Sequence, residues 1–143
     1  MKKIFREEFT LDRINELVKG TLLESLGILF TEIGSDYIRA TMPVDERTYQ
    51  PFKMLHGGAS VSLAETLGSV AATMTIDPTL QICVGQEINA NHVKSVREGQ
   101  VLGTARPVHI GSKSQVWEIR ITNERDELVC ISRMTLAVID KKV

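Results

Sequence analysis

The chain has 143 residues, 43% of them hydrophobic, which is enough to bury the core of one domain. Its formal net charge is −1 and its lysines and arginines are scattered, which excludes the clustered basic surface typical of nucleic-acid binding. No apolar run reaches membrane-spanning length, and the amino-terminal residues lack the apolar segment of a signal peptide. Cys83 and Cys130 stand alone in predicted strands, as in reduced cytosolic proteins. We therefore predict one cytoplasmic domain over residues 1–143 that binds neither nucleic acid nor a membrane.

The first half of the chain is predicted to contain two helices with a hairpin between them. Helical spacing of apolar residues, turn residues and prolines indicate the boundaries. In chain order the expected elements are a helix over 11–26 capped near Thr10 or Asp12, strands over 27–33 and 37–42 joined by the turn Gly34-Ser35-Asp36, an irregular segment over 43–53, and a long helix over 58–76 ended by Asp77-Pro78.

The second half changes to the alternating pattern typical of strands. One face of its first strand is expected to carry Ile82, Val84, Gln86, Ile88, Ala90 and His92, and the other Glu87, Asn89 and Asn91. Further strands are expected over 99–109, around 117–121 and over 128–138. Their short connections indicate an antiparallel meander. The predicted class is α+β, with one curved antiparallel sheet of about five to six strands around the long helix.

The long helix has an unusual charge distribution. Between Lys53 and Asp77 the only formally charged residue is Glu65, although helix surfaces normally carry mixed charge. One helical stripe is apolar and is expected to face the sheet: Leu63, Leu67, Val70 and Met74. The opposite stripe is small and nearly uncharged: Gly58, Ser62, Glu65, Ser69 and Ala72. We expect this second stripe to be covered, either by a partner chain or by a loop or the amino-terminal helix of the same chain.

The start of this helix and its carboxylate are too far apart to act on one atom. A helix amino terminus offers free N–H groups and partial positive charge, which suit a developing oxyanion. Gly57 and Glu65 are eight positions apart, a rise of about 12 Å along an α-helix. If both act on one substrate atom, they come most simply from two antiparallel helices related by a two-fold axis. We therefore predict an obligate dimer with two composite sites.

A block of residues around this helix start resembles a known enzyme family. The matching residues are Gln50-Pro51-x-x-Met54-Leu55-His56-Gly57-Gly58-Ala59-Ser60, then Leu63-Ala64-Glu65 and Gly68-Ser69. They are similar to acyl-CoA thioesterases with the hotdog fold. The resemblance is to the aroyl-CoA type, the group of the 4-hydroxybenzoyl-CoA and 1,4-dihydroxy-2-naphthoyl-CoA hydrolases and the enterobactin-pathway proofreading thioesterases. The resemblance implies a hydrolase of acyl-CoA thioesters that works as a dimer or a dimer of dimers.

The resemblance also implies roles for five residues. Glu65 matches the catalytic carboxylate, which acts as nucleophile or as general base on water. Gly57 matches the residue whose N–H polarises the thioester carbonyl, and His56 holds the loop or assists that polarisation. Gln50 would orient the thioester or the water, and Ser69 would hydrogen-bond the reacting water or carboxylate. In the family, Gln50 and Gly57 come from one subunit and the carboxylate and hydroxyl from the other.

Three of these residues also have purely structural interpretations. His56 is equally suited to bracing the helix start, and Gln50 to supplying loop polarity. Ser69 is small enough to permit close helix contact whether or not it has a chemical role.

Six further residues are expected at the substrate: Phe52, Met54, Val84, His92, Ser112 and Lys113. The apolar ones, together with Ile88, suggest a pocket for an aromatic or medium-chain acyl group, and His92 is either a core histidine or part of that pocket. By resemblance the turn after His109 meets the coenzyme A nucleotide. The family often has Arg where this chain has Ser112, so Lys113 is either a phosphate ligand or a solvated turn residue.

Other chemistries find little support in the sequence. There is no Gly-x-Ser-x-Gly motif, and the histidines and cysteines lack metal-ligand spacing. We expect no metal and no cofactor, since coenzyme A is part of the substrate. Two alternatives stay open: a hotdog dehydratase acting on acyl carrier protein substrates, and a non-catalytic acyl-CoA binding protein.

Overall fold

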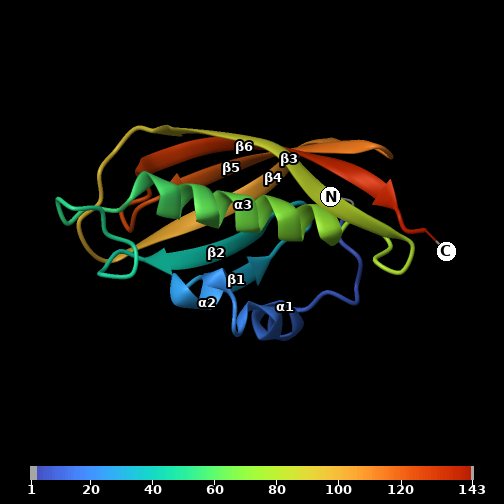
Figure 1. Cartoon of the computed structure of the whole chain (residues 1–143), viewed down its shortest axis with the longest axis horizontal. Helices are drawn as coiled ribbons and strands as arrows, with labels where there is room; N and C mark the ends of the chain where they lie inside the picture. Colours follow the sequence, from blue (N-terminus) through green and yellow to red (C-terminus); the bar gives the residue numbers. More distant parts are fainter. Residues whose placement is uncertain (1–2, 143) are drawn as a thin grey trace.

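The computed structural model describes residues 3–142 and consists of one long helix against one sheet. The elements are α1 (Leu11–Val18), α2 (Leu22–Ser25), β1 (Leu29–Ile33), β2 (Ile38–Pro43), α3 (Gly57–Thr73), β3 (Gln81–His92), β4 (Gln100–Ile110), β5 (Ser114–Thr122) and β6 (Leu128–Asp140). The strands form an antiparallel sheet in the order β1-β2-β4-β5-β6-β3, so β1 and β3 are its edges. Helix α3 lies along one face of the sheet, and α1 and α2 lie beside β1 (Figure 1). The predicted α+β architecture is confirmed.

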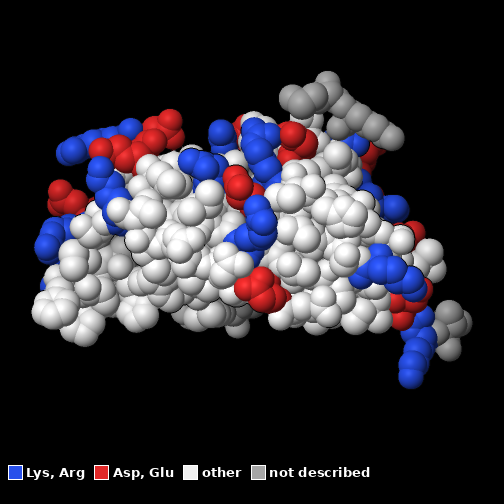
Figure 2. All heavy atoms as spheres, turned by 90° about the horizontal axis from the view of Figure 1, so that it is seen from above, with Lys and Arg blue, Asp and Glu red and all other residues white. Residues whose placement is uncertain are grey.

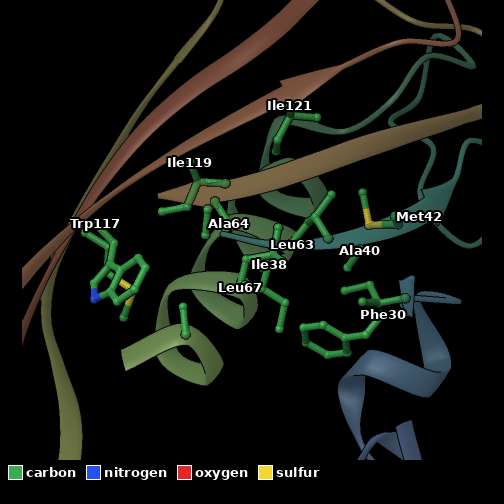
Figure 3. Packing of buried hydrophobic residues seen from close by; sticks show 14 of the residues in the cluster. Phe30, Ile38, Ala40, Met42, Leu63, Ala64, Leu67, Trp117, Ile119 and Ile121 are labelled. Carbon is green, nitrogen blue, oxygen red and sulfur yellow. The ribbon is translucent and has the colours of Figure 1, made fainter. Parts of the chain in front are cut away.

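The apolar stripe of α3 holds the helix on the sheet. Leu63, Leu67 and Met74 are fully buried, as predicted. Leu63 and Leu67 point toward side chains of the facing strands, among them Ile38 and Ile119 (Figure 3). Burying a large apolar side chain in this way contributes about 1.5–3 kcal/mol, so the contact between α3 and the sheet is a main part of the core.

The amino-terminal helix is shorter than the sequence suggests. The predicted helix over 11–26 is in fact two helices, α1 and α2, separated by a turn. The turn contains Gly20 with φ +71°, a left-handed conformation that ends α1 and that glycine adopts at little cost. Thr21 then caps α2, and Thr10 caps α1 as predicted, accepting a hydrogen bond from the Arg13 N–H at 3.3 Å.

Strand β3 does not keep the continuous alternation that was predicted. Its register with β6 shifts between Gly85 and Glu87, which places an extra residue in β3. A bulge of this kind reverses the side-chain alternation. Val84 is consequently on the outer face and 42% exposed, whereas Ile88 is on the helix side. The prediction that these two residues share a face is wrong.

The surface carries charges of both signs. In the view of Figure 2, Lys and Arg side chains are interspersed with Asp and Glu, and broad areas between them are uncharged. This distribution agrees with the net charge of −1. No helix in the described part of the chain is long and apolar enough to cross a membrane.

Candidate active site

Helix α3 begins at Gly57 because His56 caps it. His56 has extended backbone angles (φ −69°, ψ 131°), and its ring Nδ1 accepts a hydrogen bond from the Gly58 N–H at 2.7 Å. The His56 carbonyl oxygen accepts from the N–H groups of Ala59 (3.0 Å) and Ser60 (3.3 Å). Among the described residues, the Gly57 N–H has no hydrogen-bond partner. The first free donor of this helix is therefore the one predicted to polarise a carbonyl.

The loop before the helix is fixed at several points. The His56 N–H donates to the Thr48 carbonyl at 2.8 Å, and the Leu55 N–H donates to the Val96 carbonyl at 2.8 Å. Thr48 is buried, and its hydroxyl donates to the Pro43 carbonyl at 2.7 Å. These bonds hold the helix start in a defined position, as a preorganised donor requires.

A cleft of about 400 Å³ with both polar and apolar lining opens at this helix start. Gln50, Met54, Gly57 and His92 line it, so the structure brings four of the predicted site residues together. A Cβ at position 57 would lie 2.9 Å from His92 Nε2, so glycine lets the ring and the free N–H share the cleft. His92 is exposed and is not the core histidine that one interpretation predicted. Lys94 also lines the cleft, and nothing in the sequence distinguished it.

Gln50 takes part in the turn that forms one wall of the cleft. Its side-chain oxygen accepts a hydrogen bond from the Phe52 N–H, which leaves its amide NH2 group free to donate to a ligand. Phe52 itself is 76% exposed at the tip of the turn, beside Lys53 in a left-handed conformation. Phe52 therefore lies outside the cleft formed by its own chain.

Glu65 lies about two helical turns from the cleft and faces β3. A Cβ at Gly85 would lie 2.7 Å from Glu65 Oε1, so the glycine at the β3 bulge makes room for this carboxylate. Burial raises the pKa of Glu65 above its usual value. Within the described residues Glu65 forms neither a hydrogen bond nor an ion pair of its side chain. A half-buried carboxylate without a partner is poised to accept a proton or to attack an electrophile.

Ser69 lines a second cavity, which the sequence did not predict. It lies one turn after Glu65, and with Val70 and Thr73 it forms one wall of a cavity of about 290 Å³. The remaining lining is apolar and comes from β1 and the amino-terminal segment. Val70 was predicted to be buried against the sheet and is instead half-buried at this cavity. The one signal available was the apolar spacing of Ile14, Leu17 and Val18, which is equally typical of a helix packed on a core.

The turn predicted to contact coenzyme A lies at the other end of α3. The Lys113 carbonyl accepts a hydrogen bond from the Val138 N–H at 2.9 Å, and nearby Gln115 donates to the Thr75 hydroxyl at 2.8 Å, just past the end of the helix. The cleft at Gly57, Glu65 in mid-helix and the Lys113 turn are thus spread along the length of α3. One chain does not bring the predicted catalytic and coenzyme-binding residues together.

Comparisons with known proteins place this chain in one enzyme class. A family model described as the thioesterase superfamily matches residues 52–130. The 1,4-dihydroxy-2-naphthoyl-CoA hydrolase of Escherichia coli is 49% identical over 136 residues, which cover 95% of this chain and 99% of that protein. The proofreading thioesterase EntH of Cronobacter sakazakii is 48% identical over 136 residues, covering 95% and 98%. The crystal structure of a thioesterase from Haemophilus influenzae matches with a TM-score of 0.93 and 46% identity, covering 96% of this chain and 95% of that one.

The chain therefore belongs to the thioesterase superfamily. It is a hydrolase of thioesters with the hotdog fold, and the fold and activity expected from the sequence are confirmed. The roles of individual residues stay predictions.

Proposed function

We propose that the chain hydrolyses acyl-CoA thioesters of aromatic or medium-chain acids, at sites that combine residues of two subunits. One observation carries this proposal: the free N–H of Gly57 and the unpartnered carboxylate of Glu65 lie on one helix, about 12 Å apart along its axis. The N–H is suited to polarising the thioester carbonyl, and the carboxylate to activating water or attacking the carbonyl carbon. The distance between them prevents both from acting on one substrate atom within one chain. The reaction uses water and no cofactor, and we place the enzyme in the cytoplasm.

The chemistry follows from these two groups. The Gly57 N–H donates to the thioester oxygen and stabilises the negative charge that develops there. Glu65 of the partner subunit either takes a proton from water as the water oxygen bonds to the carbonyl carbon, or attacks that carbon itself to form an anhydride that water then cleaves. In both routes the C–S bond breaks, the thiolate leaves and takes up a proton, and the free acid and CoA result.

Three neighbouring side chains support this chemistry. The free NH2 group of Gln50 lies in the cleft with Gly57 and is suited to orienting the thioester or the water. The Ser69 hydroxyl, one turn after Glu65, is suited to bonding the reacting water or carboxylate. His56 acts through the helix cap, in which its Nδ1 accepts the Gly58 N–H at 2.7 Å.

Two surfaces of the fold favour a two-fold dimer. In the described part of the chain, β3 is a 12-residue edge strand with a neighbouring strand along one edge only, and such edges readily pair with another chain. In the small-residue stripe of α3, Gly58 is exposed, Ser62, Glu65 and Ser69 are half-buried, and Ala72 is fully buried within its own chain. Pairing two copies through β3 would bring their α3 helices together in antiparallel orientation. A dimer of two such dimers is compatible with the same surfaces.

The antiparallel arrangement also accounts for the coenzyme-binding residues. In one chain the Ser112–Lys113 turn lies at the carboxyl end of α3, far from the cleft. In the dimer, the carboxyl end of one α3 lies near the amino end of the other. Ser112 and Lys113 of the partner subunit would then approach the cleft at Gly57, which Lys94 also lines with its ammonium paired to Glu127 at 2.6 Å.

The second cavity is the best candidate for the acyl group. It begins one helical turn beyond Glu65 and is almost entirely apolar. A thioester carbon held at Glu65 can therefore extend its acyl substituent past Ser69 into this space. The relative that is named a hydrolase of 1,4-dihydroxy-2-naphthoyl-CoA supports an aromatic acyl group.

Mixed dimers test the shared site. Glu65→Gln removes the carboxylate, and Gln50→Ala removes the orienting amide from the other half of the site. After mixing under exchange conditions, half of the dimers contain one of each subunit, and each of these has one intact site. Thiol release from benzoyl-CoA should recover to about a quarter of the wild-type rate, whereas each variant alone stays low.

Subunit exchange can be verified by mass spectrometry of the mixed dimers. Exchange without recovery of thiol release would contradict the shared site. Substantial activity of Glu65→Gln alone would contradict the proposed function of this carboxylate.

A further inference from the structure

The second cavity is built largely by the amino-terminal segment. Five of its lining residues belong to this segment: Phe9, Ile14, Leu17, Val18 and Leu23. Ile14 and Val18 are buried and attach α1 to the core. The cavity is therefore the space between α1–α2 on one side and the second half of α3 on the other.

A pair of hydrogen bonds fixes the position of α1 against the sheet. The Asn15 side chain donates to the Phe30 carbonyl at 2.9 Å and accepts from the Phe30 N–H at 2.9 Å. Phe30 lies in the edge strand β1 and also lines the cavity. Asn15 thus bonds the backbone groups of Phe30 that a further strand would use. The same two bonds hold α1 against β1 beside the cavity.

Leu17 stands at the mouth of the cavity. It lines the cavity although it is 70% exposed. Single exposed leucines are common on protein surfaces and need no special explanation. This leucine differs in its position, because it lies on the helix fixed by Asn15 and lines, at its solvent-exposed side, the apolar space that Ser69 also lines.

We propose that α1 is the wall that determines acyl-group selectivity, with Leu17 limiting the bulk admitted at the mouth and Asn15 acting as a positioning residue. This inference rests on the proposed function, because it takes the second cavity as the acyl site. Asn15 touches no substrate and acts by setting the distance between α1 and α3. Loosening this wall changes which acyl groups are preferred, without removing the catalytic groups.

The first experiment enlarges the residue at the mouth. The measured quantity is the ratio of kcat/KM for decanoyl-CoA to kcat/KM for butyryl-CoA. Leu17→Trp should lower this ratio about tenfold, since a few methylene groups in an apolar pocket are worth one to two orders of magnitude in discrimination. The matched control is Leu29→Trp, because Leu29 is 52% exposed on β1 and lines neither the cleft nor the second cavity. The control should leave the ratio and the activity unchanged.

The second experiment loosens the wall. Asn15→Leu keeps a similar volume but removes both hydrogen bonds to Phe30, so KM for decanoyl-CoA should rise while kcat changes little. The Phe30 amide should also lose protection in hydrogen exchange. Asn15→Asp keeps the acceptor for the Phe30 N–H. It should therefore restore part of the low KM for decanoyl-CoA and part of the protection of the Phe30 amide.

Two results would overturn the inference. One is an unchanged ratio in Leu17→Trp, or an equal change in Leu29→Trp. The other is an Asn15→Leu enzyme that loses amide protection and yet keeps the wild-type KM for both substrates. The proposed function is tested separately, because loss of thiol release in Glu65→Gln for every acyl-CoA does not depend on α1.

Discussion

The two halves of α3 lie in different surroundings. Its amino-terminal half begins in a cleft of mixed polar and apolar lining, where the loop is held by backbone hydrogen bonds and His56 leaves the Gly57 N–H free among the described residues. Its carboxyl-terminal half borders an apolar cavity between α3 and the helices α1 and α2, which is lined by side chains of both. Glu65 lies between them. One helix can therefore carry the polar groups that a reaction needs at one end and the apolar groups that select a substrate at the other.

Replacing the carboxylate between the two halves should have the largest effect. Glu65→Gln keeps the shape of the side chain but neither accepts the water proton nor attacks the thioester. We expect kcat for thiol release to fall by about three orders of magnitude. Thr66→Val, on the adjacent helix position, serves as a control for the disturbance of α3. Analytical ultracentrifugation should show the same oligomer for wild type and Glu65→Gln.

Removing the donor of the polar half should have the next largest effect. Gly57→Pro lacks the N–H, and proline is well tolerated as first residue of a helix after an extended residue such as His56. Gly57→Ala is the matched control, because it makes the same close contact with His92 but keeps the N–H. We expect kcat of the proline variant to be about a hundredfold lower than that of the alanine variant. Equal values would show that this N–H does not stabilise the transition state.

The burial of Glu65 predicts a pH dependence. Because the pKa of Glu65 is raised by burial, activity should fall on the acid side at a pH above the usual glutamate value. The same shift means that the charged form is disfavoured in the folded protein. The stability associated with this group is therefore present below its unfolded-state pKa and is lost as the pH rises through its folded-state pKa. Glu65→Gln should consequently unfold at a higher temperature than wild type at neutral pH, and this difference should shrink in acid. A lower Tm for the variant at neutral pH would contradict the assigned burial effect.

Loss of the helix cap should have the smallest effect of the four. His56→Ala leaves the Gly58 N–H without its acceptor and should lower the free energy of unfolding by about 1 kcal/mol. His56→Asn supplies another capping acceptor and should recover most of this stability. Urea unfolding measures the free energy of unfolding of both variants. An alanine variant as stable as wild type, but inactive, would instead place His56 directly in the chemistry.

Particular residues show how far the sequence could be interpreted. The lone charge at Glu65, its spacing from Gly57 and the apolar spacing of Leu63 and Leu67 indicated the long helix, its buried face and the separation of the two groups. These features depend on the regular rise and period of an α-helix, so they can be calculated from residue numbers. The block from Gln50 to Ser69 could be compared with the thioesterase family directly, since its residues are close in sequence.

The features that were missed depend on contacts between distant segments. The bulge in β3 lies where Gly85 approaches Glu65 of α3 and Met134 of β6, and alternation alone gives no sign of it. The break between α1 and α2 at Gly20 could have been predicted from the glycine, but the docking of α1 by Asn15 could not. Asparagine at that position is equally compatible with an exposed helix surface.

The sequence by itself determined the class of fold, the family, the candidate catalytic residues and the incompatibility of Gly57 and Glu65 within one chain. The class of fold and the separation of the two groups follow from local periodicity and helix geometry, which a short stretch of chain contains completely. The family and the candidate catalytic residues follow from the resemblance of a short block of residues to known thioesterases. Only the tertiary structure decided which N–H is free, which face Val84 occupies and where the apolar cavity lies. Those properties arise where α1, α3, β1 and β3 meet, and packing between distant segments has no local signature in the chain.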